Sequence, residues 1–385
     1  MRPSRPAIGF VVAALACCGR TLDHHRPLQR LPPLGRSILV LAPHPDDEVL
    51  GAAAVIDVAR RSGAQVHVLV ATDGERGPDK TGAPDLGEER REETRRALGD
   101  LGLGADAVTF LGYADGSLAG SWGNGWTAVP RAGGSVSADA VVDALRAALR
   151  GARPNTVVLP IAVDAHPDHR ALNRFALLAL LGEADRLPVL GYLIHAKRWP
   201  SDAGDPRLTS CAGALFRWDA LSLSRAAVER KTALIETYRT QVGHSRRLLH
   251  FANPIEPFAR EDATLMPQAM GLMRPGVQRT SHRIIIRVPR GPCVADPDAS
   301  DRLRLRFFGA GGVEDRVIGL DRMTVVEGGR PGRPPAPAHD VLARTTGASI
   351  RLQLAATTFG NITGAVLEVL PGSARRIGPA WVLLW

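Results

Sequence analysis

The chain has 385 residues, of which 45% are hydrophobic and 23% are charged, an ordinary globular composition that excludes wholesale disorder and a collagen-like fibre. Its four cysteines include no CxxC pair, which argues against a disulfide scaffold or a cysteine-rich zinc module. The formal charge of +9 comes almost entirely from arginine, and no basic run is interleaved with aromatic residues, so we expect no nucleic-acid partner.

The first 36 residues are expected to precede the fold. Residues 1–18 combine two arginines, an apolar run from Ala7 to Ala16 that is too short to span a bilayer, and the pair Cys17-Cys18. This segment resembles a bacterial lipoprotein signal, whose cysteine is lipidated, and residues 19–36 read as a tether. The protein would then be an extracytoplasmic lipoprotein of the cell envelope, held at a membrane. The alternatives are a cleaved secretory signal and a cytoplasmic protein with a misassigned start codon.

Short apolar strands then alternate with helical segments between residues 37 and 250. The expected strands are Ser37–Ala42, Gln65–Thr72, Ala107–Leu111, Thr156–Pro160 and Val189–His195. The expected helices are Asp47–Ser62, Glu88–Leu101, Ala138–Arg150, Arg170–Leu181 and Ser222–Gln241. This alternation predicts an α/β fold, with a Rossmann-like, mostly parallel sheet covered by helices on both faces. Ligands of such sheets bind beyond the carboxyl ends of the strands.

The pattern changes after residue 250. Residues 251–281 read as a linker that contains proline and methionine. Polar and apolar residues then alternate in Arg302–Phe308, Ser349–Leu354 and Ala365–Leu370, as in half-buried antiparallel strands, and Pro331–Ala338 reads as a surface loop. Residues 282–385 are therefore predicted to form a small all-β, sandwich-like domain.

A polar cluster follows the first expected strand directly. The run His44-Pro45-Asp46-Asp47-Glu48 places an imidazole and three carboxylates where the strand ends and a helix begins. Such a cluster is costly to bury unless a cation or water organises it. The alternative is that one aspartate caps the helix, because Asp is a favoured N-cap residue. Capping leaves the imidazole and the second aspartate unexplained.

A second cluster, residues 164–169 (DAHPDH), follows the fourth expected strand. Both clusters should face one crevice, because the carboxyl ends of parallel strands share one edge of the sheet. Together they offer two His and one Asp as ligands for a divalent metal, with one Asp and one His to spare. Three protein ligands and an open position are typical of catalytic zinc sites, and this donor set also suits Fe²⁺ or Co²⁺.

With both clusters present, the chain resembles the LmbE-like, or PIG-L, family of metal-dependent N-deacetylases over about residues 37–250. Other segments match features of the family in the same order: Arg90-x-x-Glu93, Leu101-Gly102, Gly112 to Gly116, and Lys231 through Gln241.

The resemblance implies a role for each site residue. It implies that the metal ligands are His44, Asp47 and His169. It also implies that Asp46 is the general base toward a metal-activated water, that His166 stabilises the oxyanion or protonates the leaving amine, and that Arg90 and Asp115 contact sugar hydroxyls.

The sequence allows two roles for each of three residues near these positions. Asp168 is expected either to orient a protonated His166 or to cap a helix. Trp122 and Trp126 either wall a sugar site by ring stacking or are tucked against the domain. Some family members place a tyrosine just upstream of the His-x-x-His, where this chain has residues 161–164 (IAVD). The sequence does not identify what replaces that tyrosine.

The predicted function is therefore zinc-dependent removal of the N-acetyl group from an N-acetylglucosamine-type amino sugar of a glycan or glycolipid. One alternative is an amidase of a larger amide conjugate in the same family. Another is a non-catalytic envelope protein that binds carbohydrate through its β-region. The chain has no Gly-x-Ser-x-Gly elbow and no Gly-x-Gly-x-x-Gly after its first strand, which argues against a serine hydrolase and a dinucleotide-binding enzyme.

Overall fold

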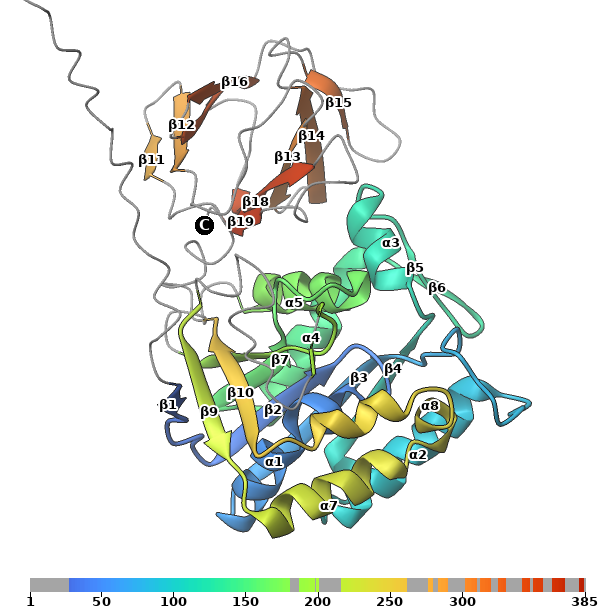
Figure 1. Cartoon of the computed structure of the whole chain (residues 1–385). Helices are drawn as coiled ribbons and strands as arrows, with labels where there is room; N and C mark the ends of the chain where they lie inside the picture. The colour runs from blue at the N-terminus through green and yellow to red at the C-terminus, as the bar shows by residue number, and fades with distance from the viewer. Residues whose placement is uncertain are drawn as a thin grey trace, which may run out of the picture.

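The structure is a computed structural model that describes residues 28–180, 187–197, 199–200 and 216–261, and the strands that lie between residues 276 and 383. These residues form an α/β domain and a C-terminal region of strands (Figure 1). The expected signal, residues 1–18, and the expected loop Pro331–Ala338 lie outside the described residues. Among the described residues, no helix combines the length and the apolar character that crossing a bilayer requires.

A ten-stranded sheet forms the centre of the α/β domain. In spatial order its strands are β1 (Gln29–Arg30), β9 (Trp218–Ser222), β10 (Ile255–Arg260), β8 (Val189–Tyr192), β7 (Thr156–Pro160), β2 (Ser37–Ala42), β3 (Gln65–Thr72), β4 (Val108–Tyr113), β5 (Val129–Arg131) and β6 (Gly134–Val136). The five strands from β8 to β4 are parallel to one another. Antiparallel strands extend both sides, with β10 beside β8 and the β5–β6 hairpin beside β4.

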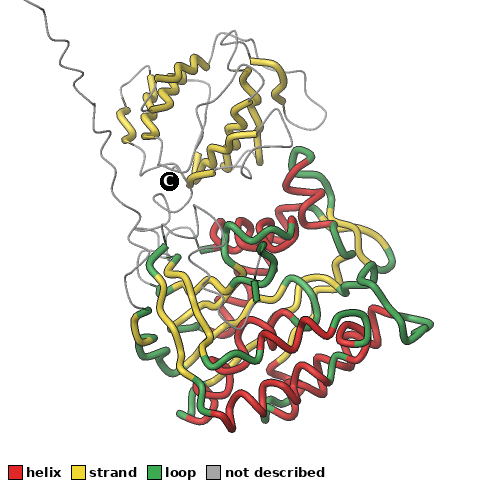
Figure 2. The backbone as a smooth tube through the Cα atoms, in the orientation of Figure 1, coloured by secondary structure: helices red, strands yellow, loops and turns green. Residues whose placement is uncertain are grey.

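Helices cover both faces of this sheet (Figure 2). They are α1 (Asp47–Arg61), α2 (Leu86–Asp100), α3 (Ser117–Gly123), α4 (Ala138–Ala152), α5 (Pro167–Ala179), α7 (Arg225–Glu236) and α8 (Arg239–Val242). Short 3-10 helices span Ala105–Ala107 and Arg246–Phe251. All six residues of β2 are buried, and they alternate between two cores, with Ile38 and Val40 facing α1, α2 and α7 and with Leu39 and Leu41 facing α3, α4 and α5. The predicted α/β fold class is confirmed.

Several boundaries differ from the expectation. Residues Gln29–Arg30 of the expected tether form strand β1, which pairs parallel with β9 in the central sheet. Strand β10 lies inside the predicted linker, residues 251–281, and pairs antiparallel with β8 and β9 because Phe258 and Ala259 bury their side chains in the core. The segment Ser222–Gln241 is not one helix. The Ser224 hydroxyl accepts the N–H of Ala227 and starts α7 there, and α8 follows as a separate turn.

The C-terminal strands form two antiparallel sheets, as a sandwich-like domain requires. One sheet has the order β11-β12-β17-β16 and the other the order β15-β14-β13-β18-β19. The strands are β11 (Gly276–Arg279), β12 (Arg283–Pro289), β13 (Arg302–Gly309), β14 (Gly312–Gly319), β15 (Val325–Gly329), β16 (Val341–Thr346), β17 (Ser349–Ala355), β18 (Ile362–Leu370) and β19 (Trp381–Leu383). The three strands expected here correspond to β13, β17 and β18.

Candidate active site

Polar side chains from four loops meet at the carboxyl edge of the parallel strands. β2 is followed by His44–Glu48, β4 by Asp115, β7 by Asp164–His169, and β8 by His195. The two clusters singled out in the sequence therefore share one site. The fourth loop was not predicted to take part in it.

Arg90 of α2 holds the turn after β2. Its guanidinium is buried and donates to the carbonyls of Gly74 (2.7 Å) and Pro45 (2.6 Å). It also lies 3.3 Å from Oδ2 of Asp46. These contacts give Arg90 a positioning role toward Asp46. The expected contact of Arg90 with a sugar hydroxyl stays a prediction.

Asp46 does not cap α1 with its side chain, so the capping reading of this residue is wrong. Only its backbone carbonyl accepts the N–H groups of Val49 (3.0 Å) and Leu50 (2.9 Å). Its φ is 119°, a strained backbone conformation for a non-glycine residue, of a kind that clusters at functional sites. Burial raises the pKa of Asp46 to about 8, against the opposing positive charge of Arg90.

Asp47 links the two predicted clusters. Its Oδ2 lies 3.1 Å from Nδ1 of His44 and 3.1 Å from Nε2 of His169. All three side chains are buried. Burial opposes the ionisation of Asp47, but the imidazoles of His169 and His44 hold its pKa well below the usual range. Burial likewise opposes charge on His169, and Asp47 and Asp164 raise its pKa to about 9.

Asp164 supports His169 from behind, a role that the sequence did not reveal. Its Oδ2 lies 3.3 Å from Nδ1 of His169 and accepts the N–H groups of Ile194 and His195, both at 2.9 Å. Its Oδ1 accepts the N–H of His166 at 2.8 Å. Within residues 161–164, where some family members have a tyrosine, Asp164 is a fully buried carboxylate that joins the loops after β7 and β8. The buried Asp five residues before His169 was the available signal.

His195 was also missed. Its ring centroid lies 4.8 Å from that of His169 and 5.0 Å from that of His166, and its side chain is exposed at the rim of the site. Burial of its ring and the charge of His169 lower the pKa of His195. A histidine just beyond a buried strand, at the same sheet edge as the two clusters, was the signal that could have found it.

Asp115 and Asp168 face His44 from the other side. Nε2 of His44 lies 3.3 Å from Oδ1 of Asp115 and 3.6 Å from Oδ2 of Asp168. The Asp168 carboxylate also accepts the N–H groups of Gly116 and Ala119, both at 2.7 Å. Asp168 therefore caps a helix, but the helix is α3 and not its own. The expectation that it orients His166 is not met, since its carboxylate is turned to His44 and α3.

His166 lies over both neighbouring imidazoles, with ring centroids 4.7 Å from His44 and 5.0 Å from His169. Burial and the positive charges of those two residues lower its pKa to about 4. The lowered pKa favours the neutral imidazole near neutral pH, and the expected role of His166 at the oxyanion or the leaving amine stays a prediction. Its Nδ1 has no hydrogen-bond partner among the described residues, which leaves that nitrogen for a ligand.

The donor set fits a divalent metal. Candidate groups of three, with ligand atoms within 4.8 Å of one another, are His44/His166/His169, Asp47/His169/His195 and His44/Asp115/Asp168. The predicted ligands His44, Asp47 and His169 are distributed over these overlapping groups. Both ring nitrogens of His169 and Nε2 of His44 are buried without a hydrogen-bond partner among the described residues. Imidazole nitrogens and carboxylates so placed are ligands that zinc, Fe²⁺ or Co²⁺ accepts.

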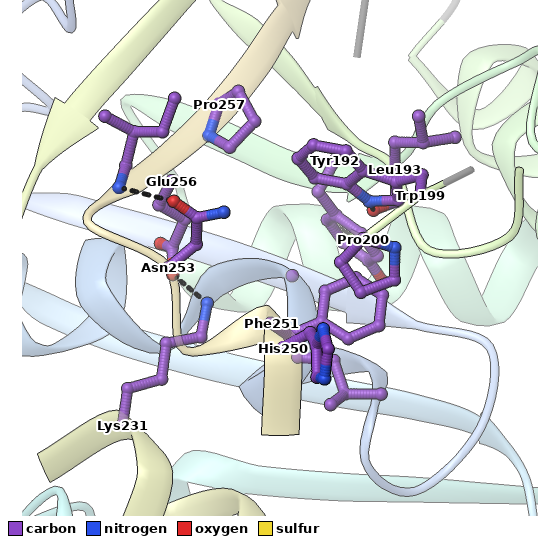
Figure 3. A pocket seen from close by; sticks show the side chains of 13 residues that line it. Tyr192, Leu193, Trp199, Pro200, Lys231, His250, Phe251, Asn253, Glu256 and Pro257 are labelled. Carbon is purple, nitrogen blue, oxygen red and sulfur yellow. Dashed lines mark hydrogen bonds and ion pairs between the residues drawn. The ribbon is translucent and has the colours of Figure 1, made fainter. Parts of the chain in front are cut away.

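A separate small cavity of about 10 Å³ lies beneath α1, between β8, β10 and α7. Lys231 and Glu256 form an ion pair of 2.6 Å in its wall (Figure 3). Glu256 also accepts the N–H groups of Ala54 and Val55 of α1. The cavity has room for about one water molecule and contains none of the site residues described above, so it is structural.

Trp122 and Trp126 are tucked against the domain and do not wall the site. Trp122 is 2% exposed, and its ring lies edge-on to Phe175 of α5 with centroids 5.4 Å apart. The ring centroid of Trp126 lies 5.2 Å from that of Phe175 and 5.2 Å from that of Phe308 in β13. These rings therefore belong to the packing between α3, α5 and the C-terminal strands.

Comparison with known proteins matches the same part of the chain. Residues 39–180 match the family model PIG-L, described as GlcNAc-PI de-N-acetylase. A 1D-myo-inositol 2-acetamido-2-deoxy-alpha-D-glucopyranoside deacetylase of Rhodococcus opacus (strain B4) is 36% identical over 168 residues, which cover 40% of this chain and 57% of the relative. A protein of the same name from Streptomyces griseus is 30% identical over 208 residues, covering 47% and 62%. The chain thus spans little more than half the length of these relatives.

Among solved structures, the conserved protein TT1542 from Thermus thermophilus is similar with a TM-score of 0.41 and 26% identity. The similarity covers 59% of this chain and 94% of that one.

Proposed function

We propose, from the premise that residues 39–180 form a PIG-L domain, that this protein hydrolyses the N-acetyl amide of an N-acetylglucosamine-type amino sugar and releases acetate. The observation that carries the proposal is the convergence of His44, Asp47 and His169 around one carboxylate oxygen, with 3.1 Å from each imidazole to Oδ2 of Asp47. Two distant loops supply these groups.

His44, Asp47 and His169 are proposed to hold a divalent metal, with zinc as the first candidate. When bound, such an ion polarises an amide carbonyl and lowers the pKa of a water molecule. The carboxylates of Asp46, Asp47, Asp115, Asp164 and Asp168 are gathered around the same site, an arrangement that a bound cation would stabilise.

Asp46 is proposed as the general base. The Asp46 carboxylate makes no capping hydrogen bond to α1. Its Oδ2 lies 3.3 Å from Nη2 of Arg90, which orients the side chain and leaves Oδ1 to accept a proton. A carboxylate with a raised pKa is matched to proton transfer near neutral pH. His166, neutral and with an unpartnered Nδ1 among the described residues, is proposed to donate a hydrogen bond to the oxyanion or to the departing amine.

The substrate class rests on the relatives and on Asp115. The family description and the two curated relatives all name a glucosamine-type sugar that carries an acetamido group. The Asp115 side chain is 14% exposed and stands next to His44, where its carboxylate can accept a hydrogen bond from a sugar hydroxyl.

The experiment is an acetate-release assay on purified protein reconstituted with zinc. N-Acetylglucosamine, its inositol glycoside, N,N′-diacetylchitobiose and an amide with a larger acyl group are tested side by side. Acetate release from at least one acetylated sugar, with the larger amide left intact, is the expected result. Preference for the larger amide favours the amidase alternative, and absence of turnover on every amide favours a binding protein.

We also propose that the protein is anchored outside the cytoplasm through Cys17 or Cys18, a proposal that rests on the sequence of residues 1–18 alone. One acyl chain binds a membrane only reversibly, whereas two or more hold a domain stably. Membrane fractionation of the wild type beside a Cys17→Ser/Cys18→Ser double variant tests it. A wild type found wholly in the cytosolic fraction with its N-terminal residues intact ends the anchoring proposal and leaves the hydrolase proposal untouched.

A further inference from the structure

An arginine of the C-terminal strands is buried against the α/β domain. Arg306 of β13 is 1% exposed, a placement that is strongly unfavourable for an unpaired charge. Its guanidinium is paired, with Nε and Nη2 at 2.6 and 2.7 Å from the two carboxylate oxygens of Asp315. Its remaining nitrogen, Nη1, donates to the carbonyl of Trp122 at 3.1 Å. The ion pair with Asp315 compensates the buried charge of Arg306. The hydrogen bond to Trp122 connects Arg306 to the α/β domain.

The contact of Arg306 falls on the C-terminal end of α3. Arg304, two residues earlier on β13, donates to the carbonyl of Gly123 at 2.6 Å and to that of Trp122 at 3.2 Å. Carbonyls in the last turn of a helix have no partner within the helix, and cations there also complement the helix dipole. The Arg306 guanidinium further lies over the rings of Trp122 (5.0 Å) and Trp126 (5.2 Å).

The N-terminal end of α3 is fastened to the candidate site. Asp168 accepts the N–H groups of Gly116 and Ala119 at its start, and lies 3.6 Å from Nε2 of His44. Asp115, one residue before Gly116, lies 3.3 Å from the same nitrogen. The helix is therefore tied to His44 at one end and to β13 at the other.

A helix of this kind depends on such ties. α3 has seven residues, and two of them are Gly120 and Gly123. Isolated helices shorter than about 12 residues are marginal in water, and glycine destabilises a helix relative to alanine. Its position therefore depends on tertiary contacts, which include the burial of Leu118 and Trp122 and the groups bound at its two ends.

We infer that Arg304 and Arg306 are positioning residues, through which the C-terminal strands fix α3 and so hold Asp115 and Asp168 beside His44. The C-terminal region would then act on the α/β domain as part of the substrate site's support and not as an independent appendage. The expected change in KM rests on the proposed function, whereas the expected change in the stability of α3 does not.

The test compares Arg306→Met, Arg304→Met and Arg306→Lys with the wild type. Arg146→Met is the matched control, because Arg146 forms an exposed ion pair with Asp143 within α4. Hydrogen exchange followed by mass spectrometry reads out peptides that span residues 114–128. We expect exchange there to be roughly tenfold faster in both methionine variants and unchanged in the control, with peptides of α1 unaffected. Since Arg306 is buried, Arg304→Met decides the outcome if Arg306→Met fails to fold.

The kinetic arm measures KM and kcat for an acetylated amino sugar. We expect KM to rise about five- to thirtyfold in the methionine variants, while kcat stays within about threefold and the zinc content is unchanged, since Asp115 contacts substrate and the ligand loops are intact. Arg306→Lys should recover part of the loss because it keeps the charge without the fork-shaped donor. Unchanged exchange over residues 114–128 in both methionine variants overturns the inference. Faster exchange there, in a protein that hydrolyses none of the amides tested, upholds it and refutes only the proposed function.

Discussion

Nε2 of His169 lies 3.1 Å from Oδ2 of Asp47, although more than 120 residues separate the two in the chain. The contact joins the start of α5 to the start of α1, across the neighbouring parallel strands β7 and β2. The two side chains form a buried ion pair, in which Asp47 raises the pKa of His169 and the imidazole lowers the pKa of Asp47. Two side chains of the kinds that bind divalent metals therefore lie in contact at the carboxyl edge of the sheet.

The first prediction is that the reconstituted protein binds about one equivalent of zinc and that His169→Ala does not. His169 supplies a ligand from α5, and its loss leaves two donors where a stable catalytic zinc site has three. Elemental analysis after dialysis measures the metal. Added zinc should also raise the Tm of the wild type, because a ligand of the folded state stabilises that state by mass action, and should leave the Tm of His169→Ala unchanged.

The control for this experiment is His67→Ala, since His67 is a half-buried histidine of β3 outside the site. It should bind zinc like the wild type. A wild type that retains no stoichiometric metal after reconstitution contradicts the prediction and the metal-dependent function with it.

The second prediction concerns Asp46→Asn, which is expected to lower kcat roughly 10²–10⁴-fold, the usual contribution of a general base. The amide cannot take a proton but has the same shape, and it still accepts a hydrogen bond from Arg90. Zinc content and the thermal unfolding curve should match the wild type, because the ligands are untouched and the side chain caps no helix. Retention of full turnover by this variant would show that Asp46 has only a structural role.

The sequence was sufficient for the parts of the fold that depend on local pattern. Strand β2 has the predicted bounds Ser37–Ala42, because a continuous apolar run between polar segments has few other ways to bury itself. Strand β10 was not predicted, since its residues Ile255–Arg260 include a proline and two charges. That strand is stabilised by tertiary contacts, among them the pairing of Glu256 with Lys231 of α7.

The candidate site shows the same division. His44, Asp47 and His169 were found because the His-Pro-Asp runs are local and recur at strand ends. The contacts of Arg90 with the carbonyls of Gly74 and Pro45 were not predicted, because these residues lie in other loops and only the three-dimensional structure brings them together. The hydrogen bonds between Asp168 and the start of α3 were not predicted for the same reason, since the backbone N–H donors belong to Gly116 and Ala119, about 50 residues earlier in the chain.

The third prediction is a pH-dependent penalty from Glu261, which follows β10. Burial raises the pKa of Glu261 to about 7, although the N–H of Ala162 (2.8 Å) and the side-chain amide of Asn173 (2.6 Å) favour its charged form. A carboxyl whose pKa is higher in the folded state than in the unfolded state favours folding when protonated. Its contribution to stability is therefore present at low pH and is lost as the pH rises from about 4.5 to 7.

Glu261→Gln removes this titration. The free energy of unfolding of the variant minus that of the wild type should therefore be larger at pH 8 than at pH 5, by on the order of 3 kcal/mol at most. Urea unfolding of both proteins at the two pH values measures the difference. Comparing the two proteins at each pH cancels the other titrating groups. A difference that is the same at both values contradicts the raised pKa.

The fourth prediction is that Asp164→Asn weakens zinc binding about 10–100-fold, the usual cost of losing a carboxylate behind a metal-ligating histidine. Asp164 Oδ2 lies 3.3 Å from Nδ1 of His169 and also accepts two backbone N–H groups of the loop after β8. Asparagine keeps one accepting oxygen for that loop but removes the negative charge that favours a proton on Nδ1 and so leaves Nε2 to the metal. Competition with a zinc chelator measures the Kd, and Asp143→Asn, which removes an exposed carboxylate of α4, is the matched control. If Asp164→Asn and the control bind zinc with equal affinity, Asp164 only closes the loop, and the orientation of His169 is set by packing alone.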